Sequence, residues 1–222
     1  MSRYDARQAV NAFFLAPTEA LARLLPPGLS PLEARPRHGV LAITSFDFSA
    51  SEVGPYAELA LSVLVSPYCP KGEALPHAAT FPFFLMTTTQ ASAEDARTRW
   101  ALPCAPYSGV VQFSHDAERY TVEMSVEGVP ALRLSVRRGP PAPSTRIYQL
   151  FTRREASLYR VALAIEGPFE ERDDEGGRLE LFDHPVAAMI SELLADDTPI
   201  LEQSMEAGVQ RFGVLTPFGG AA

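Results

Sequence analysis

The chain has 222 residues and a formal net charge of −8 at pH 7, with 46% hydrophobic and 21% charged residues. These values are typical of a globular protein that buries a sizeable core, and the negative charge argues against nucleic acid or an anionic membrane as a partner. Two cysteines, Cys69 and Cys104, are too few for a disulfide framework. Almost all basic residues are arginine, as in GC-rich bacterial genomes. Because the chain opens with no leader and has no apolar run of about 18 residues, we expect a soluble, cytoplasmic, bacterial protein.

Three segments carry helical signals. Residues 18–25 begin at an N-cap type residue and end at a Pro-Pro-Gly turn, and their leucines share one face. Residues 92–100 open with Ser92, followed three positions later by Asp95, which is close to a capping box. A third helix is expected over residues 199–206.

Strand signals dominate the rest of the chain. Runs of β-branched or aromatic residues between turn residues predict strands over 40–48, 56–65, 80–88, 108–114, 120–127, 131–137, 147–152, 157–165 and 178–182. The segment 120–127 and its successor are expected to form a hairpin. The charged stretch 171–177 predicts a turn, and the proline-rich stretch 139–143 predicts a loop between strands, so we expect a single domain over residues 1–222.

The strands are not separated by regular helices, which argues against a doubly wound α/β fold. Several strands are apolar on both faces, as in Val40-Leu41-Ala42-Ile43. A curved sheet or barrel wrapped by helices would bury both faces.

Segments in matching order resemble the acetoacetate decarboxylase family. Arg7 precedes a helix and a Leu-Pro-Pro-Gly-Leu turn, and residues 54–58 read Gly-Pro-Tyr-Ala-Glu. Residues 179–185 read Leu-Glu-Leu-Phe-Asp-His-Pro, and Pro103-Cys104 gives a weaker match. The resemblance implies an α+β, mainly β fold, in which a curved antiparallel sheet or barrel encloses an apolar cavity with a few flanking helices.

In that family a neutral lysine amine attacks the ketone of the substrate, and the resulting iminium accepts the electrons released as CO2 departs. Here Cys104 and Ala105 stand at the lysine position, and the one lysine of the chain is Lys71. A thiol forms no iminium, so Cys104 is either a thiolate nucleophile or, as we favour, a small buried filler. Lys71 lies in a turn-rich loop, where it is either exposed or reaches the mouth of the cavity.

Glu58 follows Tyr56 by two positions, so both side chains point to one side of a strand. A carboxylate that faces a barrel interior needs a partner, and the resemblance suggests Arg7. The pair either serves the cavity or is a structural ion pair. An ungapped count back from Glu58 puts Ile43 where the family has a second cavity acid, which argues further against decarboxylation.

The remaining candidate residues carry weaker signals. Asp183 and His184 are adjacent, so on a strand they point opposite ways and make a poor dyad; we expect Asp183 to cap a turn before Pro185. The chain has no hydrolase or metal-binding motif, and we expect neither a metal nor a cofactor.

Two classes of function therefore stay open. The first is a protein that binds a small molecule with a keto or carboxylate end in its cavity without Schiff-base decarboxylation, using Arg7, Tyr56, Glu58, Pro103 and Cys104. The second is an enzyme of the same superfamily, for instance one that transfers a proton on a β-dicarbonyl with Glu58 as acid or base. A classical decarboxylase would require Lys71 to reach the cavity. The expected partner is a small molecule, and the resemblance makes a homo-oligomer plausible.

Overall fold

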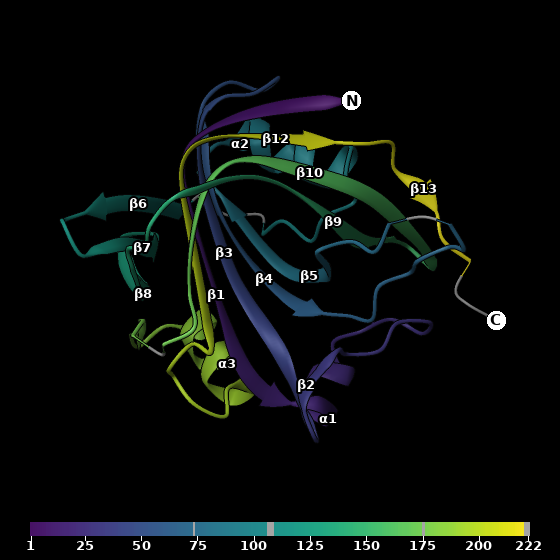
Figure 1. The fold of residues 1–222 in the computed structure, drawn as a ribbon, viewed down its shortest axis with the longest axis horizontal. Helices are drawn as coiled ribbons and strands as arrows, with labels where there is room; N and C mark the ends of the chain where they lie inside the picture. The colour runs from purple at the N-terminus through teal and green to yellow at the C-terminus, as the bar shows by residue number, and fades with distance from the viewer. Residues whose placement is uncertain (73, 106–108, 175, 220–222) are drawn as a thin grey trace.

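The central feature of the computed structural model, which describes residues 1–72, 74–105, 109–174 and 176–219, is a closed seven-stranded β-barrel (Figure 1). Around the barrel the strands follow the order β1, β12, β10, β9, β5, β4 and β3, and β3 pairs with β1 to close it. Neighbours run antiparallel, except that β5 and β9 pair in parallel over residues 78–80 and 148–150. The barrel strands are β1 (Ser2–Pro17), β3 (His38–Ala50), β4 (Tyr56–Leu64), β5 (Ala78–Thr87), β9 (Ala142–Arg154), β10 (Ser157–Arg172) and β12 (Leu201–Phe212).

A second, four-stranded sheet lies against one side of the barrel, at the left of Figure 1. Its order is β11 (Arg178–Leu181), β8 (Val129–Arg137), β7 (Arg119–Val126) and β6 (Gly109–His115). The predicted β7–β8 hairpin is confirmed, and its turn residues Glu127 and Gly128 have φ of 51° and 80°, as a type I′ turn requires.

Short elements complete the described structure. They are α1 (Thr18–Ala22), α2 (Gln90–Thr98), α3 (Pro185–Leu193), β2 (Glu33–Arg35), which extends the barrel sheet beside β3, and β13 (Thr216–Pro217), which pairs with β10. No helix in the described ranges is both long and apolar enough to cross a bilayer.

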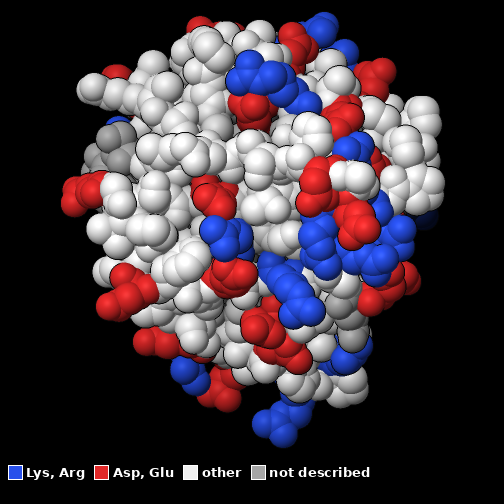
Figure 2. Space-filling model, turned by 90° about the vertical axis from the view of Figure 1, so that its left-hand side faces the viewer, with Lys and Arg blue, Asp and Glu red and all other residues white. Residues whose placement is uncertain are grey.

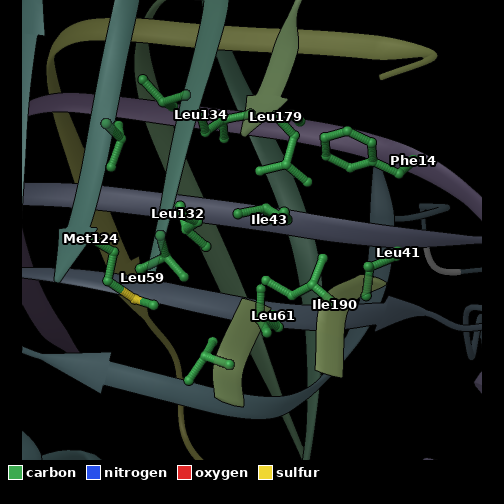
Figure 3. Packing of buried hydrophobic residues seen from close by; sticks show 14 of the residues in the cluster. Phe14, Leu41, Ile43, Leu59, Leu61, Met124, Leu132, Leu134, Leu179 and Ile190 are labelled. Atoms are coloured by element: carbon green, nitrogen blue, oxygen red, sulfur yellow. The ribbon is translucent and has the colours of Figure 1, made fainter. Parts of the chain in front are cut away.

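The main apolar core lies outside the barrel, between its wall and the second sheet (Figure 3). Ile43, Leu59 and Leu61 project from β3 and β4 toward Met124 and Leu132 of the second sheet, and each is at most 1% exposed. Because side chains alternate along a strand, the residues between them point into the barrel. The expectation that strands with two apolar faces belong to a wrapped barrel is therefore confirmed.

The predicted third helix over residues 199–206 is wrong, because residues 201–206 belong to β12. This strand pairs with β1 along one edge and β10 along the other, and these long-range ladders override the local preference of its Leu, Glu, Gln and Met residues for helix. The strand β1 was not predicted.

The helix boundaries also differ from those predicted. The helix α2 starts earlier than expected, because Thr89 is its N-cap and accepts a hydrogen bond from the Ser92 amide. The helix α3 was not predicted; it has Pro185 in its first turn, where proline is favoured. Its cap is His184, whose Nδ1 accepts from the Val186 amide at 3.1 Å, rather than the expected Asp183.

Candidate functional site

The barrel contains two adjoining, partly open chambers of about 90 Å³ each. Both are lined by Thr44, Phe46, Thr80 and Leu163, so one continues into the other. A dry cavity of about 150 Å³ holds a benzene molecule, so by the same packing each chamber holds about four non-hydrogen atoms. We call them the Glu58 chamber and the Ser204 chamber, after one polar residue that lines each.

Glu58 is the one carboxylate among the described residues that line the two chambers, and no described Lys, Arg or His lines either. The strand β4 presents it on the same side as Ala60 and Ser62. The side chain lies deep in the protein but keeps some accessible surface, because it faces a chamber.

The pKa of the Glu58 carboxyl lies near neutral pH. Burial raises the pKa of its carboxyl to about 7, and a hydrogen bond from the Tyr56 hydroxyl acts in the opposite direction. Burial, and then the nearby charge of Glu58, raise the pKa of Tyr56, which therefore stays protonated and remains a donor. Its ring packs against Phe48 with centroids 5.0 Å apart. A carboxyl with such a pKa is present in both forms near neutral pH, as acid–base chemistry requires.

A further polar group faces the Glu58 chamber without a hydrogen-bond partner among the described residues. Gln210 lines this chamber and is 3% exposed, and its Oε1 is not hydrogen bonded to a described residue. Buried polar atoms are almost always hydrogen bonded, so this amide is suited to a polar atom of a ligand. Sequence reasoning missed Gln210 because no strand was predicted over β12.

Cys104 lies beside the site but does not line a chamber. The backbone of its segment is pinned to β5, where the Ala105 amide donates to the Leu85 carbonyl at 2.8 Å. Its Sγ lies 3.9 Å from Oγ1 of Thr87, which pairs with Glu58 across β4 and β5. Burial raises the pKa of the thiol, which favours the filler interpretation over the thiolate. Pro103 lines an outer groove instead.

The predicted pairing of Arg7 with Glu58 is wrong. Arg7 points out of the barrel with 59% of its side chain exposed, and its guanidinium donates to both carboxylate oxygens of Asp47 at 2.8 and 2.7 Å. Arg7 lies where the pairing of β1 with β3 shifts register, between Ala6 and Gln8, so the regular alternation of the strand is interrupted at this position.

The placement of Ile43 at a cavity position is also wrong. Ile43 points into the outer core, and its neighbours Ala42 and Thr44 are the chamber-lining positions of β3. Lys71 is exposed in a turn and does not line a chamber. Among the residues that the structure describes, no group of three or more His, Cys, Asp or Glu is placed to hold a metal.

Known proteins that are similar to this chain in sequence or fold have an architecture of this kind. A sequence model described as acetoacetate decarboxylase (ADC) matches residues 1–194. The structure of acetoacetate decarboxylase from Legionella pneumophila subsp. pneumophila str. Philadelphia 1 is 14% identical with a TM-score of 0.75, and the match covers 98% of this chain and 87% of that one.

Two other solved structures are also similar in fold. The enduracididine biosynthesis enzyme MppR complexed with pyruvate is 14% identical with a TM-score of 0.68 and coverages of 98% and 90%. An acetoacetate decarboxylase-like enzyme from Sphingomonas wittichii RW1 is 14% identical with a TM-score of 0.64 and coverages of 98% and 92%. No curated protein matches the sequence.

Proposed function

Because the chain belongs to the acetoacetate decarboxylase family, we propose that its barrel cavity binds the carbonyl end of a small molecule, and that it does so without a Schiff base. One observation carries the proposal: a carboxyl faces the cavity, and no described amine does. In its protonated form Glu58 donates a hydrogen bond to a carbonyl oxygen, and the amide of Gln210 in the same chamber offers a second polar contact. The similar fold of MppR, which was solved with pyruvate, supports an oxo compound as the ligand.

The charge of the cavity restricts which part of the ligand enters it. With Arg7 outside the barrel, no described cation is present to balance a ligand carboxylate beside Glu58. An uncompensated buried charge is costly. The neutral keto or enol end therefore belongs in the Glu58 chamber, and any carboxylate belongs outside it.

A second candidate function, proton transfer, is favoured by the pKa of Glu58, which is about 7. The Glu58 carboxylate would take a proton from the carbon next to the carbonyl. The electrons of that C–H bond would move to the carbonyl oxygen as an enolate, and return of the proton would restore the ketone. A base works best when its pKa lies near the operating pH, which the apolar surroundings of Glu58 provide.

Proton NMR in D2O with acetylacetone and acetoacetate tests both candidates. Wild type is expected to bind acetylacetone and to accelerate the exchange of its α-protons, whereas Glu58→Gln is expected to bind it without accelerating exchange. Glu94→Gln, on the exposed side of α2, is the matched control and should behave as wild type. Binding without exchange in wild type would leave the binding function and exclude proton transfer.

Borohydride trapping read by mass spectrometry tests the absence of a Schiff base. We expect no adduct with acetoacetate. A stable adduct on Lys71 would refute the proposal, because it would show that the lysine reaches the bound ketone.

A further inference from the structure

An arginine-lined groove of about 590 Å³ lies outside the barrel, next to the Glu58 chamber. We call it the arginine groove. Its cations come from three parts of the fold: Arg23 at the C-terminal end of α1, Arg97 on α2, and Arg153 and Arg154 at the end of β9. Segments far apart in the sequence thus contribute four arginines to the lining of one hollow.

The positive charge of the groove is largely uncompensated. Arg23 makes an exposed ion pair with Glu19, a type that contributes little, and Arg154 donates to the backbone carbonyl of Thr98. Arg97 and Arg153 make no ion pair or side-chain hydrogen bond with any residue in the described ranges. Glu155 is the one acid among the described lining residues.

This local excess of positive charge contrasts with the net charge of the whole chain, which is −8. On the face shown in Figure 2, acidic and basic side chains lie next to one another. In the second sheet, for example, Arg133 pairs with Glu123 and Glu180. Of the four arginines that line the groove, Arg23 alone makes such a pair with a described residue, and an excess of unpaired positive charge is typical of a surface that binds an anion.

The groove and the Glu58 chamber share part of their walls. Pro82 and Leu102 line both. Burial is the main effect on the pKa of Cys104 and raises it, but the positive charge of Arg97 acts in the opposite direction. The field of the groove therefore reaches the segment next to Glu58.

We infer that the arginine groove binds a phosphate-bearing tail of the same ligand whose carbonyl end enters the Glu58 chamber. The inference rests on the proposed function for the position of the carbonyl. The chamber holds only about four non-hydrogen atoms and lacks a described cation, whereas the groove is several times larger and carries four arginines. Guanidinium groups match phosphate oxygens with pairs of parallel hydrogen bonds. A carbonyl compound linked to phosphate groups, such as a β-keto thioester of coenzyme A, has this distribution of charge.

Calorimetry with three probes tests the inference: acetylacetone as the neutral end alone, inorganic pyrophosphate as the anion alone, and acetoacetyl-coenzyme A as both. Wild type should bind pyrophosphate in a salt-sensitive way, and acetoacetyl-coenzyme A about tenfold or more tightly than acetylacetone. The double variant Arg97→Ala/Arg153→Ala should lose this advantage and the pyrophosphate binding, but keep acetylacetone binding. The control Arg35→Ala/Arg178→Ala removes the same charge from exposed positions elsewhere and should behave as wild type.

The possible failures are distinguishable. If acetylacetone does not bind, the proposed function fails, and pyrophosphate still tests the groove by itself. If wild type does not bind pyrophosphate, or if the groove variant binds it equally well, the inference is overturned. It is also overturned if the groove variant changes the oligomeric state in light scattering while its pyrophosphate affinity is unchanged, because the arginines would then serve contact between copies. Leu102→Trp should block simultaneous binding and reduce the affinity for acetoacetyl-coenzyme A to that for pyrophosphate.

Discussion

Replacing Glu58 by glutamine is expected to stabilise the protein at alkaline pH and to change its stability little in acid. The pKa of Glu58 is raised from 4.5 in a solvated chain to about 7 in the folded protein. Between these values the folded protein holds a proton that the unfolded chain releases, so the free energy of unfolding falls as pH rises through this window. Below it both states are protonated, and the full stability is present.

The size of the effect on stability depends on the difference between the pKa of Glu58 in the folded protein and in the unfolded chain. At about 1.4 kcal/mol per pKa unit, the ionisation of Glu58 costs at most about 3 to 4 kcal/mol above the window. The cost in stability is smaller than this maximum, because the carboxyl keeps contact with the chamber. The glutamine variant retains an oxygen that accepts from Tyr56 but carries no charge, so it does not have this cost.

Urea unfolding at about pH 5 and about pH 8 measures the difference. The stability of the variant relative to wild type should increase between the two conditions by up to about 3 kcal/mol, whereas Glu94→Gln should show no such increase. Stabilities of wild type and Glu58→Gln that stay parallel across the range would refute the reasoning, because they would show that the carboxyl ionises at the same pH in the folded and unfolded chain.

Three further predictions concern the site and the core. Tyr56→Phe removes a donor to the carboxylate and should raise the pKa of Glu58 further, which NMR titration of the carboxyl carbon measures; an unchanged or lower pKa would contradict the described hydrogen bond. A thiol reagent should modify exposed Cys69 in the folded protein but buried Cys104 only after unfolding, and rapid labelling of both would argue against the filler interpretation. Leu61→Ala should lower the free energy of unfolding by about 3 kcal/mol, since its side chain is fully buried between barrel and second sheet, and a loss below about 1 kcal/mol would contradict that packing.

The barrel class and most strands could be predicted from the sequence, because β-branched runs with two apolar faces need cover on both sides. The strand β12 could not, since its pairing depends on distant segments. Glu202 within it is 1% exposed and accepts hydrogen bonds from the amides of Arg137 and Gly177 at 2.7 and 2.5 Å. A glutamate that looks like a surface helical residue is thus a buried link between β12 and residues far away in the sequence.

Positions of site residues could be predicted where they depend on a single strand. They could not be predicted where they depend on how two strands are aligned. Tyr56 and Glu58 share a face because they are two residues apart on β4. The partner of Arg7 depended on which face β1 turns inward and on its register with β3, where Asp47 lies beside the adjacent Gln8. Nothing within either segment fixes that register.

The pairing of β1 with β12 joins the two ends of the chain, with Ser2 opposite Phe212. A ladder between such distant segments closes late in folding, because the entropy of the whole intervening chain must be overcome first. Until β12 docks, the Glu58 chamber lacks the wall that Gln210 and Phe212 supply. In that open sheet Glu58 is solvated and is an ordinary acid. During synthesis, therefore, this carboxyl acquires its raised pKa only after β12 has been made.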